Sequence, residues 1–153
     1  MRYSGSGIIP IVHINDKKHL VVFVSKSGLL TDAGGRIDLG ETTLEASIRE
    51  LYEESCTLIK LDKELVDKSN FLDIPCGKTF YRVYFCEIVE LPKREDFLQL
   101  RDSWRFKGDY HFLENTDMTI ITIPDKVEDK ILDIFSIEWT LHSRLKKILK
   151  NTK

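Results

Sequence analysis

The chain has 153 residues, about two fifths of them apolar, which suits one well-buried domain over residues 1–153 and is short for two. Its formal charge of −2 argues against a nucleic-acid binder that relies on basic charge over its whole surface. No apolar stretch approaches the roughly 18 residues of a membrane span, and no signal peptide is recognisable. Three cysteines without metal-ligand spacing predict reduced, buried thiols and therefore a cytoplasmic protein.

The first part of the chain predicts a β-hairpin. Residues 8–14 and 19–25 are rich in β-branched side chains and are joined by a polar segment. Pro10 lacks a backbone N–H group, so it predicts that the first strand lies at a sheet edge or carries a bulge.

A glycine pair follows, within a short strand expected over residues 29–38. Gly34 and Gly35 permit backbone conformations that other residues resist, so a carbonyl group here would be able to approach a cation or a phosphate. A plain tight turn explains the pair equally well.

A helix is predicted to begin after Thr42 or Thr43. Glu45 lies three residues after Thr42, which is the spacing of a capping box. Apolar residues recur at helical spacing and predict the stripe that faces the core, namely Leu44, Ile48, Leu51 and Tyr52.

Three glutamates gather on the opposite face of this helix. Glu50, Glu53 and Glu54 stand at i, i+3 and i+4, so their carboxylates crowd one patch and repel one another by about 0.2 to 0.5 kcal/mol per pair. A divalent cation would offset the repulsion, since Mg²⁺ takes oxygen ligands and is usually held by carboxylates together with substrate phosphates. Taken alone, an acidic helix face is more often a solvated surface.

The spacing of residues around these glutamates resembles the signature box of the Nudix hydrolases. The box positions occupied here are, in chain order, Gly35, Glu41, Arg49, Glu50, Glu53 and Glu54. Six fixed residues at background frequencies of roughly 6% would match by chance in about one chain in 10⁵, so the resemblance is specific.

The chain departs from the family pattern at the end of the box. Cys56 and Thr57 stand where the family has a glycine and an apolar residue. A glycine there would suit a left-handed helix cap, and another residue pays roughly 1 kcal/mol to adopt that conformation. All charged positions are intact, so we interpret the change as a tolerated variant.

The later segments predict more strands and closing helices. Residues 79–89 form the strongest strand, apolar on both faces and therefore central. The other expectations are a connecting segment with at most one short strand (58–73), a polar loop or short helix (91–102), a half-buried strand (118–123) and two helices (126–135 and 137–150). This order indicates an α/β fold, and the resemblance implies a Nudix-type α/β/α sandwich with a mixed central β-sheet.

The resemblance also implies a reaction. Nudix hydrolases cleave a diphosphate that joins a nucleoside to another group, using bound Mg²⁺ or Mn²⁺. By similarity, the metal would be held by the backbone carbonyl of Gly35 and by Glu50, Glu53 and Glu54, while Arg49 and Glu41, together with Gly34, would support the turn and the helix. For Arg49 a surface ion pair with Glu45 is the alternative.

Catalytic and substrate-binding candidates complete the predicted site. The general base would come from a box glutamate or from Glu114, although a solvated loop glutamate is the alternative. Trp104 and Arg105 lie in a run that interleaves aromatic and basic residues, as in a site that stacks a base and binds phosphate; core packing is the alternative for Trp104. Arg36 is a third substrate-binding candidate. The four histidines share no spacing and receive no role.

The substrate and the catalytic status stay open at this level. A small nucleotide is favoured, while nucleoside triphosphates, dinucleoside polyphosphates, diphosphoinositol phosphates and an RNA 5′ cap are alternatives; nucleic acid is expected only as capped RNA. A Nudix module that binds nucleotides without turnover is a second class, and a structural domain with an acidic helix face requires the box to be a coincidence. The sequence does not indicate an oligomeric state.

Overall fold

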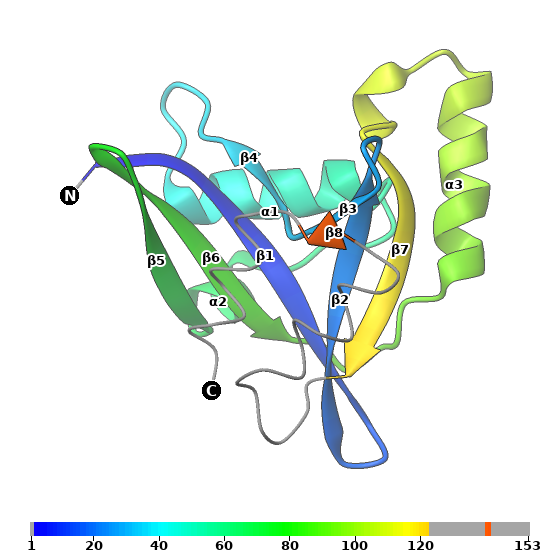
Figure 1. The fold of residues 1–153 in the computed structure, drawn as a ribbon, viewed down its shortest axis with the longest axis horizontal. Helices are drawn as coiled ribbons and strands as arrows, with labels where there is room; N and C mark the ends of the chain where they lie inside the picture. Colours follow the sequence, from blue (N-terminus) through cyan, green and yellow to red (C-terminus); the bar gives the residue numbers. More distant parts are fainter. Residues whose placement is uncertain (1, 123–139, 142–153) are drawn as a thin grey trace.

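A mixed β-sheet with helices packed against it forms the protein in a computed structural model that describes residues 2–122 and 140–141 (Figure 1). The strands are β1 (Tyr3–Ile14), β2 (Lys17–Ser25), β3 (Leu29–Thr31), β4 (Ala33–Arg36), β5 (Asn70–Cys76), β6 (Thr79–Glu87), β7 (Asn115–Thr122) and β8 (Thr140–Leu141). The helices are α1 (Thr43–Glu54), α2 (Lys63–Asp67), α3 (Arg94–Phe106) and the short 3₁₀ helix η1 (Tyr110–Phe112).

The sheet is organised around β1 and β2. Its main path runs β5-β6-β1-β2-β3-β8, while β4 pairs with β1 and β7 pairs with β2. β1 is parallel to β6 and antiparallel to β2 and β4. The predicted mixed sheet and the central position of β6 are therefore confirmed.

The hairpin between β1 and β2 closes more tightly than predicted. Its turn consists of Asn15 and Asp16, whose φ angles are 52° and 64°. Two consecutive positive φ angles are typical of the two-residue turn that matches the twist of paired strands, and asparagine and aspartate tolerate this conformation well. β2 consequently begins at Lys17, two residues before the predicted start.

Pro10 lies in a central strand, so the predicted edge or bulge at this residue is wrong. One side of β1 pairs with β6 through Pro10 opposite Cys86, whereas the other side changes partner, from β4 at Ile8 to β2 at Ile11. The Ile11 carbonyl accepts a hydrogen bond from the β6 side, and neighbouring residues alternate, so the nitrogen of Pro10 faces the junction between β4 and β2. The missing N–H group falls where the sheet has a gap.

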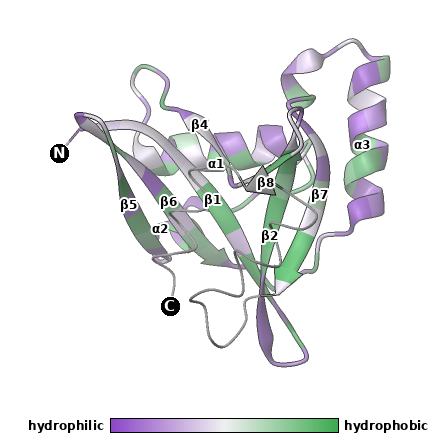
Figure 2. Cartoon of the chain, in the orientation of Figure 1, coloured by the Kyte–Doolittle hydropathy of each residue, from purple (hydrophilic) through white to green (hydrophobic). Residues whose placement is uncertain are grey.

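Apolar side chains alternate along the strands and form two clusters. The cluster on one face contains Ile8, Val12 and Phe23, and α1, α2 and α3 all contribute side chains to it; the other cluster contains Ile9, Leu20 and Val22. In Figure 2, hydrophobic residues follow the strands, while hydrophilic and hydrophobic residues alternate along α3. The helix predicted over residues 126–135 lies outside the described residues, as does the end of the strand predicted over 118–123. Of the helix predicted over 137–150, the structure describes only residues 140–141, and there the prediction is wrong, because these residues form β8, which pairs with β3.

Two segments are more regular than the sequence indicated. The stretch predicted as a connection contains α2 and the edge strand β5, and the predicted loop or short helix is the full helix α3. β5 carries the polar residue Asp73, which lies opposite Arg82 of β6 and forms an ion pair with it. α3 buries only Phe97 completely. No helix within the described ranges is long and apolar enough to cross a membrane.

Candidate active site

The capping box predicted for α1 is present. The Thr42 hydroxyl accepts a hydrogen bond from the Glu45 backbone N–H at 3.1 Å, and the Glu45 carboxylate accepts one from the Thr42 N–H at 3.2 Å. This reciprocal pair satisfies two N–H groups that have no partner within the helix, and it fixes where the helix begins.

The predicted apolar stripe of α1 is confirmed at Leu51, which is buried, and at Leu44 and Ile48, which pack against the core, but the helix buries more than this stripe. Its buried residues are Ala46, Ser47, Glu50, Leu51 and Glu54. Tyr52, predicted to face the core, is 37% exposed, whereas the side chains of Glu50 and Glu54 lie under neighbouring elements. The acidic face is therefore not solvated, because α1 packs along β1 and β4 and turns this face towards them.

The glycine pair lies in β4 and is neither a tight turn nor a site of unusual φ. Gly34 and Gly35 pair with Gly7 and Ser6 of β1, and neither glycine has a positive φ. A Cβ atom at Gly34 would lie 1.8 Å from the Tyr81 hydroxyl oxygen, and one at Gly35 would lie 2.7 Å from Glu50 Oε1. Glycine is thus needed here for close approach, which brings the β4 backbone against the acidic face of α1.

Arg49 connects the carboxylates of the box. Its guanidinium group donates two hydrogen bonds to Glu41, at 2.8 and 2.9 Å, and single bonds to Glu50 at 3.1 Å and Glu53 at 3.2 Å. It also donates to the backbone carbonyl of Arg36 at 3.0 Å, which ties α1 to the end of β4. Arg49 therefore contacts the carboxylates of the box. The alternative, an ion pair between Arg49 and Glu45, is not present among the described residues.

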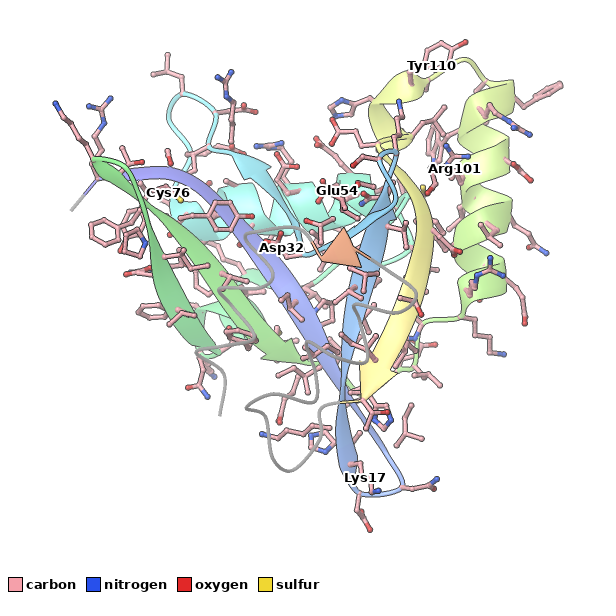
Figure 3. The ribbon with its side chains drawn as sticks, viewed as in Figure 1. Lys17, Asp32, Glu54, Cys76, Arg101 and Tyr110 are labelled. Carbon is pink, nitrogen blue, oxygen red and sulfur yellow. The ribbon has the colours of Figure 1, made fainter. Side chains whose placement is uncertain are left out.

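Glu54 is the most deeply placed of the three glutamates. Its Oε2 accepts a hydrogen bond from the backbone N–H of Gly34. Burial raises the pKa of this carboxyl group well above its ordinary value, and the charges of Asp32, Glu50 and Glu114 raise it further. Figure 3 shows Glu54 and Asp32 near each other at the centre of the molecule.

Glu50 has the same tendency. Burial raises the pKa of its carboxyl group, the charges of Glu53 and Glu114 act in the same direction, and Arg49 opposes them. Carboxylates that resist ionisation in the protein alone are well placed to gain from a bound cation, because the cation favours the charged form.

Two residues of the loop after α3 face the box. His111 Nε2 lies 2.8 Å from Glu53 Oε1, and this interaction raises the pKa of the imidazole. Glu114 is exposed, and its charge acts on both Glu50 and Glu54. His111 escaped the sequence analysis because its contact with α1 depends on the path of the loop, for which spacing along the chain carries no signal.

The predicted substrate-binding residues have local partners. Trp104 packs on Phe112 with ring centroids 4.3 Å apart, and Lys107 Nζ lies 4.6 Å from the centroid of its ring. Arg105 is exposed and pairs with Asp102 at 3.2 Å, and Arg36 is exposed at the end of β4. These contacts give Trp104 a packing role. That Trp104, Arg105 or Arg36 contacts the substrate stays a prediction.

The end of α1 keeps the conformation that glycine would favour. Cys56 and Thr57 have φ angles of 57° and 71°. The Cys56 N–H donates to Glu53 O and the Thr57 N–H to Tyr52 O, which is the hydrogen-bond pattern of a Schellman cap.

Cys56 and Cys86 are free and buried, as predicted, whereas Cys76 is free and exposed. Burial raises the pKa of the Cys56 thiol to about 11, so this group is protonated at neutral pH.

The donor set of the site fits a hard divalent cation. Within the described ranges, no three carboxylate, imidazole or thiol groups are close enough to hold a metal ion together. One oxygen of Glu50 accepts a hydrogen bond from Arg49, and one oxygen of Glu54 accepts one from the Gly34 N–H. The candidate ligands are nevertheless all oxygens, two of their carboxylates are buried, and Gly35 leaves room where a Cβ would meet Glu50. Oxygen ligands of this kind suit Mg²⁺ and Mn²⁺.

A consequence for stability follows from the raised pKa of Glu54. Above the ordinary value of 4.5, the native state binds more protons than the unfolded state, so without metal the free energy of unfolding should fall as the pH rises until Glu54 is ionised. The Glu54→Gln variant keeps the acceptor for Gly34, and we expect it to melt higher than the wild type at pH 7, by about 3 °C for each kcal/mol gained.

Thermal melts from pH 4.5 to 8, with and without Mg²⁺, check this expectation. Mg²⁺ should raise the melting temperature of the wild type at pH 7 and have a smaller effect on Glu54→Gln, because a ligand that binds only the native state stabilises it. Parallel pH profiles of the two proteins without metal would show that Glu54 is not the group responsible.

Comparison with known proteins identifies the fold. The structure is similar to a C. elegans Ap4A hydrolase in a binary complex (14% identity, TM-score 0.55, covering 95% of this chain and 91% of that one). It is also similar to the Nudix hydrolase RenU from M. smegmatis, with 11% identity and a TM-score of 0.55, covering 96% of this chain and 86% of that one. A third similar structure is the NUDIX domain of Shewanella oneidensis NrtR complexed with ADP ribose, with 8% identity and a TM-score of 0.52, covering 98% of this chain and 85% of that one. No family model and no curated protein matches the chain. At these identities the likeness concerns the fold, and the predicted Nudix-type α/β architecture is confirmed.

Proposed function

We propose that this protein is a metal-dependent hydrolase that cleaves the diphosphate linkage of a nucleoside diphosphate joined to another group. The observation that carries the proposal is the meeting of the predicted box residues where β4 crosses α1, with two buried carboxylates whose charges repel each other. A single side chain, that of Arg49, contacts Glu41, Glu50, Glu53 and the Arg36 carbonyl.

The residues of the site divide into those that bind metal and those that orient them. Glu50, Glu53, Glu54 and the carbonyl of Gly35 would hold Mg²⁺ or Mn²⁺, and the bound ion supplies charge neutralisation on the diphosphate and activation of water. Arg49 orients Glu50 and Glu53 and joins them to Glu41, at the start of the helix. The β4 backbone at Gly34 holds Glu54 in place.

Glu114 is our candidate for the general base. It is exposed to solvent, and its charge acts on both Glu50 and Glu54, two of the proposed metal ligands. A carboxylate in this position can accept the proton of an attacking water, provided that the water lies within hydrogen-bond reach. Proton transfer of this kind typically contributes about 10² to 10⁴ in rate.

A small nucleotide is the proposed substrate class. Two of the similar structures are described as an Ap4A hydrolase and as a domain complexed with ADP ribose, and Ap4A and ADP ribose are both nucleotides. Arg36, Arg105 and Trp104 remain the proposed substrate contacts. We also propose that the chain forms a single domain. A cytoplasmic location is proposed as well, since the three free thiols suit a reducing compartment.

Phosphate or nucleotide release from a substrate panel tests this function. The panel contains nucleoside triphosphates, nucleoside diphosphate sugars, dinucleoside polyphosphates, capped RNA and diphosphoinositol phosphates, each with Mg²⁺, with Mn²⁺ and with a chelator. We expect turnover of one nucleotide class that stops when the chelator is added. Tight binding of a nucleotide without turnover of any compound would instead identify a binding module.

A further inference from the structure

Side-chain hydrogen bonds tie the C-terminal end of α1 to the loop that follows α3. The Cys56 thiol donates to the backbone carbonyl of Phe112 at 3.1 Å, and the Trp104 indole N–H donates to the carbonyl of Cys56 at 3.3 Å. Cys56 directly follows the C-cap residue Ser55, so the contact from Trp104 attaches α3 just past the end of α1. Cys56 is fully buried where these contacts meet.

A second connection lies at the start of β7. The Asn115 side chain, in a residue only 2% exposed, donates to the carbonyl of Glu54 at 3.4 Å, and Arg101 of α3 donates to the carbonyl of Asn115 at 2.8 Å. Figure 3 shows Arg101 on the side of α3 that faces β7. The end of α1, α3 and the start of β7 are thereby joined.

The residues that face the box lie beside these two attachment points. His111 directly precedes Phe112, and Glu114 directly precedes Asn115. With Phe112 and Asn115 both attached to the end of α1, the short stretch between them has little freedom to move relative to the glutamates of the helix. The imidazole of His111 accordingly lies at 2.8 Å from Glu53.

The hydrogen bond from the thiol to Phe112 exists because the chain has Cys56 where the box pattern has a glycine. A glycine at position 56 would fit the φ of 57° without strain, but it would have no side chain to donate to Phe112. Cysteine pays about 1 kcal/mol for the left-handed conformation and provides a buried donor in return. The replacement thus has a physical use at the place where the chain differs from the pattern.

We propose that Cys56 is a positioning residue, whose thiol holds the loop over residues 107–114 so that His111 and Glu114 face the box glutamates. This inference rests on the proposed function for its catalytic consequence. Its structural part, the attachment of the loop by the thiol, stands independently of any turnover.

The test compares Cys56→Ala with Cys56→Ser. Both variants keep a Cβ in the left-handed conformation, and they differ in whether a donor to Phe112 remains. Cys86→Ala is the matched control, because Cys86 is also fully buried in the same apolar cluster. Among the described residues, the one hydrogen-bond partner of its sulfur is the Glu87 carbonyl, at the long distance of 4.0 Å. If Cys56→Ala fails to fold, Cys56→Gly removes the thiol and relieves the strain together.

Amide hydrogen exchange over residues 110–115, measured on the full chain, reads the attachment directly. We expect faster exchange in Cys56→Ala than in the wild type, near wild-type exchange in Cys56→Ser, and no change in this segment in Cys86→Ala. Unchanged exchange in Cys56→Ala would overturn the proposal, as would an increase in Cys56→Ser equal to that in Cys56→Ala.

Kinetics on the substrate found in the panel read the catalytic consequence. We expect kcat to fall about tenfold in Cys56→Ala with little change in KM, since small displacements of catalytic groups cost rate, and to recover in Cys56→Ser. A wild-type kcat in Cys56→Ala would refute the positioning role. If the wild type itself hydrolyses nothing, the proposed function fails, while the exchange experiment still decides whether Cys56 attaches the loop.

Discussion

Replacing Glu53 with glutamine is expected to lower kcat for diphosphate hydrolysis about a thousandfold. Glu53 contacts Arg49 through one carboxylate oxygen and His111 through the other, so it lies between the helix and the loop that carries Glu114. Glutamine keeps the shape and one acceptor oxygen but loses the negative charge that a cation requires. The measurement is steady-state kinetics with Mg²⁺ on the substrate found in the panel, alongside a thermal melt that shows intact folding.

Glu45→Gln is the matched control for this experiment. It makes the same chemical change on the same helix, but Glu45 is exposed and its contacts are those of the capping box, in which glutamine also functions. We expect near wild-type kcat for this control. An unchanged kcat in Glu53→Gln would remove Glu53 from the catalytic site.

Gly34→Ala is expected to destabilise the protein by about 3 kcal/mol. The added methyl group would lie 1.8 Å from the Tyr81 hydroxyl oxygen, 2.7 Å from the carbonyl oxygen of Ser6 and 2.8 Å from the Cα of Gly7. Two of these neighbours are backbone atoms of β1, and Tyr81 is buried and donates a hydrogen bond to Asp32 at 2.6 Å. Relief therefore requires β4 to move away from β1.

Urea unfolding of Gly34→Ala and Gly77→Ala measures this effect against a suitable reference. Gly77 has a φ of +63° with open space around it, so alanine there costs only the backbone term, about 1 kcal/mol. We expect Gly34→Ala to be the more destabilised of the two by a clear margin. The reverse order would mean that β1 and β4 accommodate a side chain at this position.

Local signals in the sequence were sufficient for the start of α1. The capping box depends on residues three apart, and the hydrogen bonds between Thr42 and Glu45 are those that the spacing predicts. Runs of apolar residues were also sufficient to predict β1, β2 and β6 and the position of β6 between two other strands, but not the order of the strands in the sheet. Likewise, the glycine that the family pattern has at position 56 would suit a left-handed helix cap, and the positive φ of Cys56 agrees with that expectation.

The features that local signals did not reveal depend on tertiary contacts. Hydrophobic periodicity places Glu50 and Glu54 on a solvated face, whereas the structure packs this face against β4, where Gly35 leaves room for Glu50. The rule that proline lies at sheet edges failed at Pro10 because β1 changes partners beside that residue. Periodicity within one element cannot report which other element will cover it.

The parallel pairing of β1 with β6 affects how the chain reaches its native state during synthesis. β1 is synthesised before its partner β6, and the elements from β2 to β5 are made between them. The hairpin with β2 can close early, whereas the backbone N–H and C=O groups on the other edge of β1 stay unpaired until β6 has been made. An unpaired edge of this kind is prone to aggregation, so the nascent chain has a period of vulnerability that ends when β6 docks.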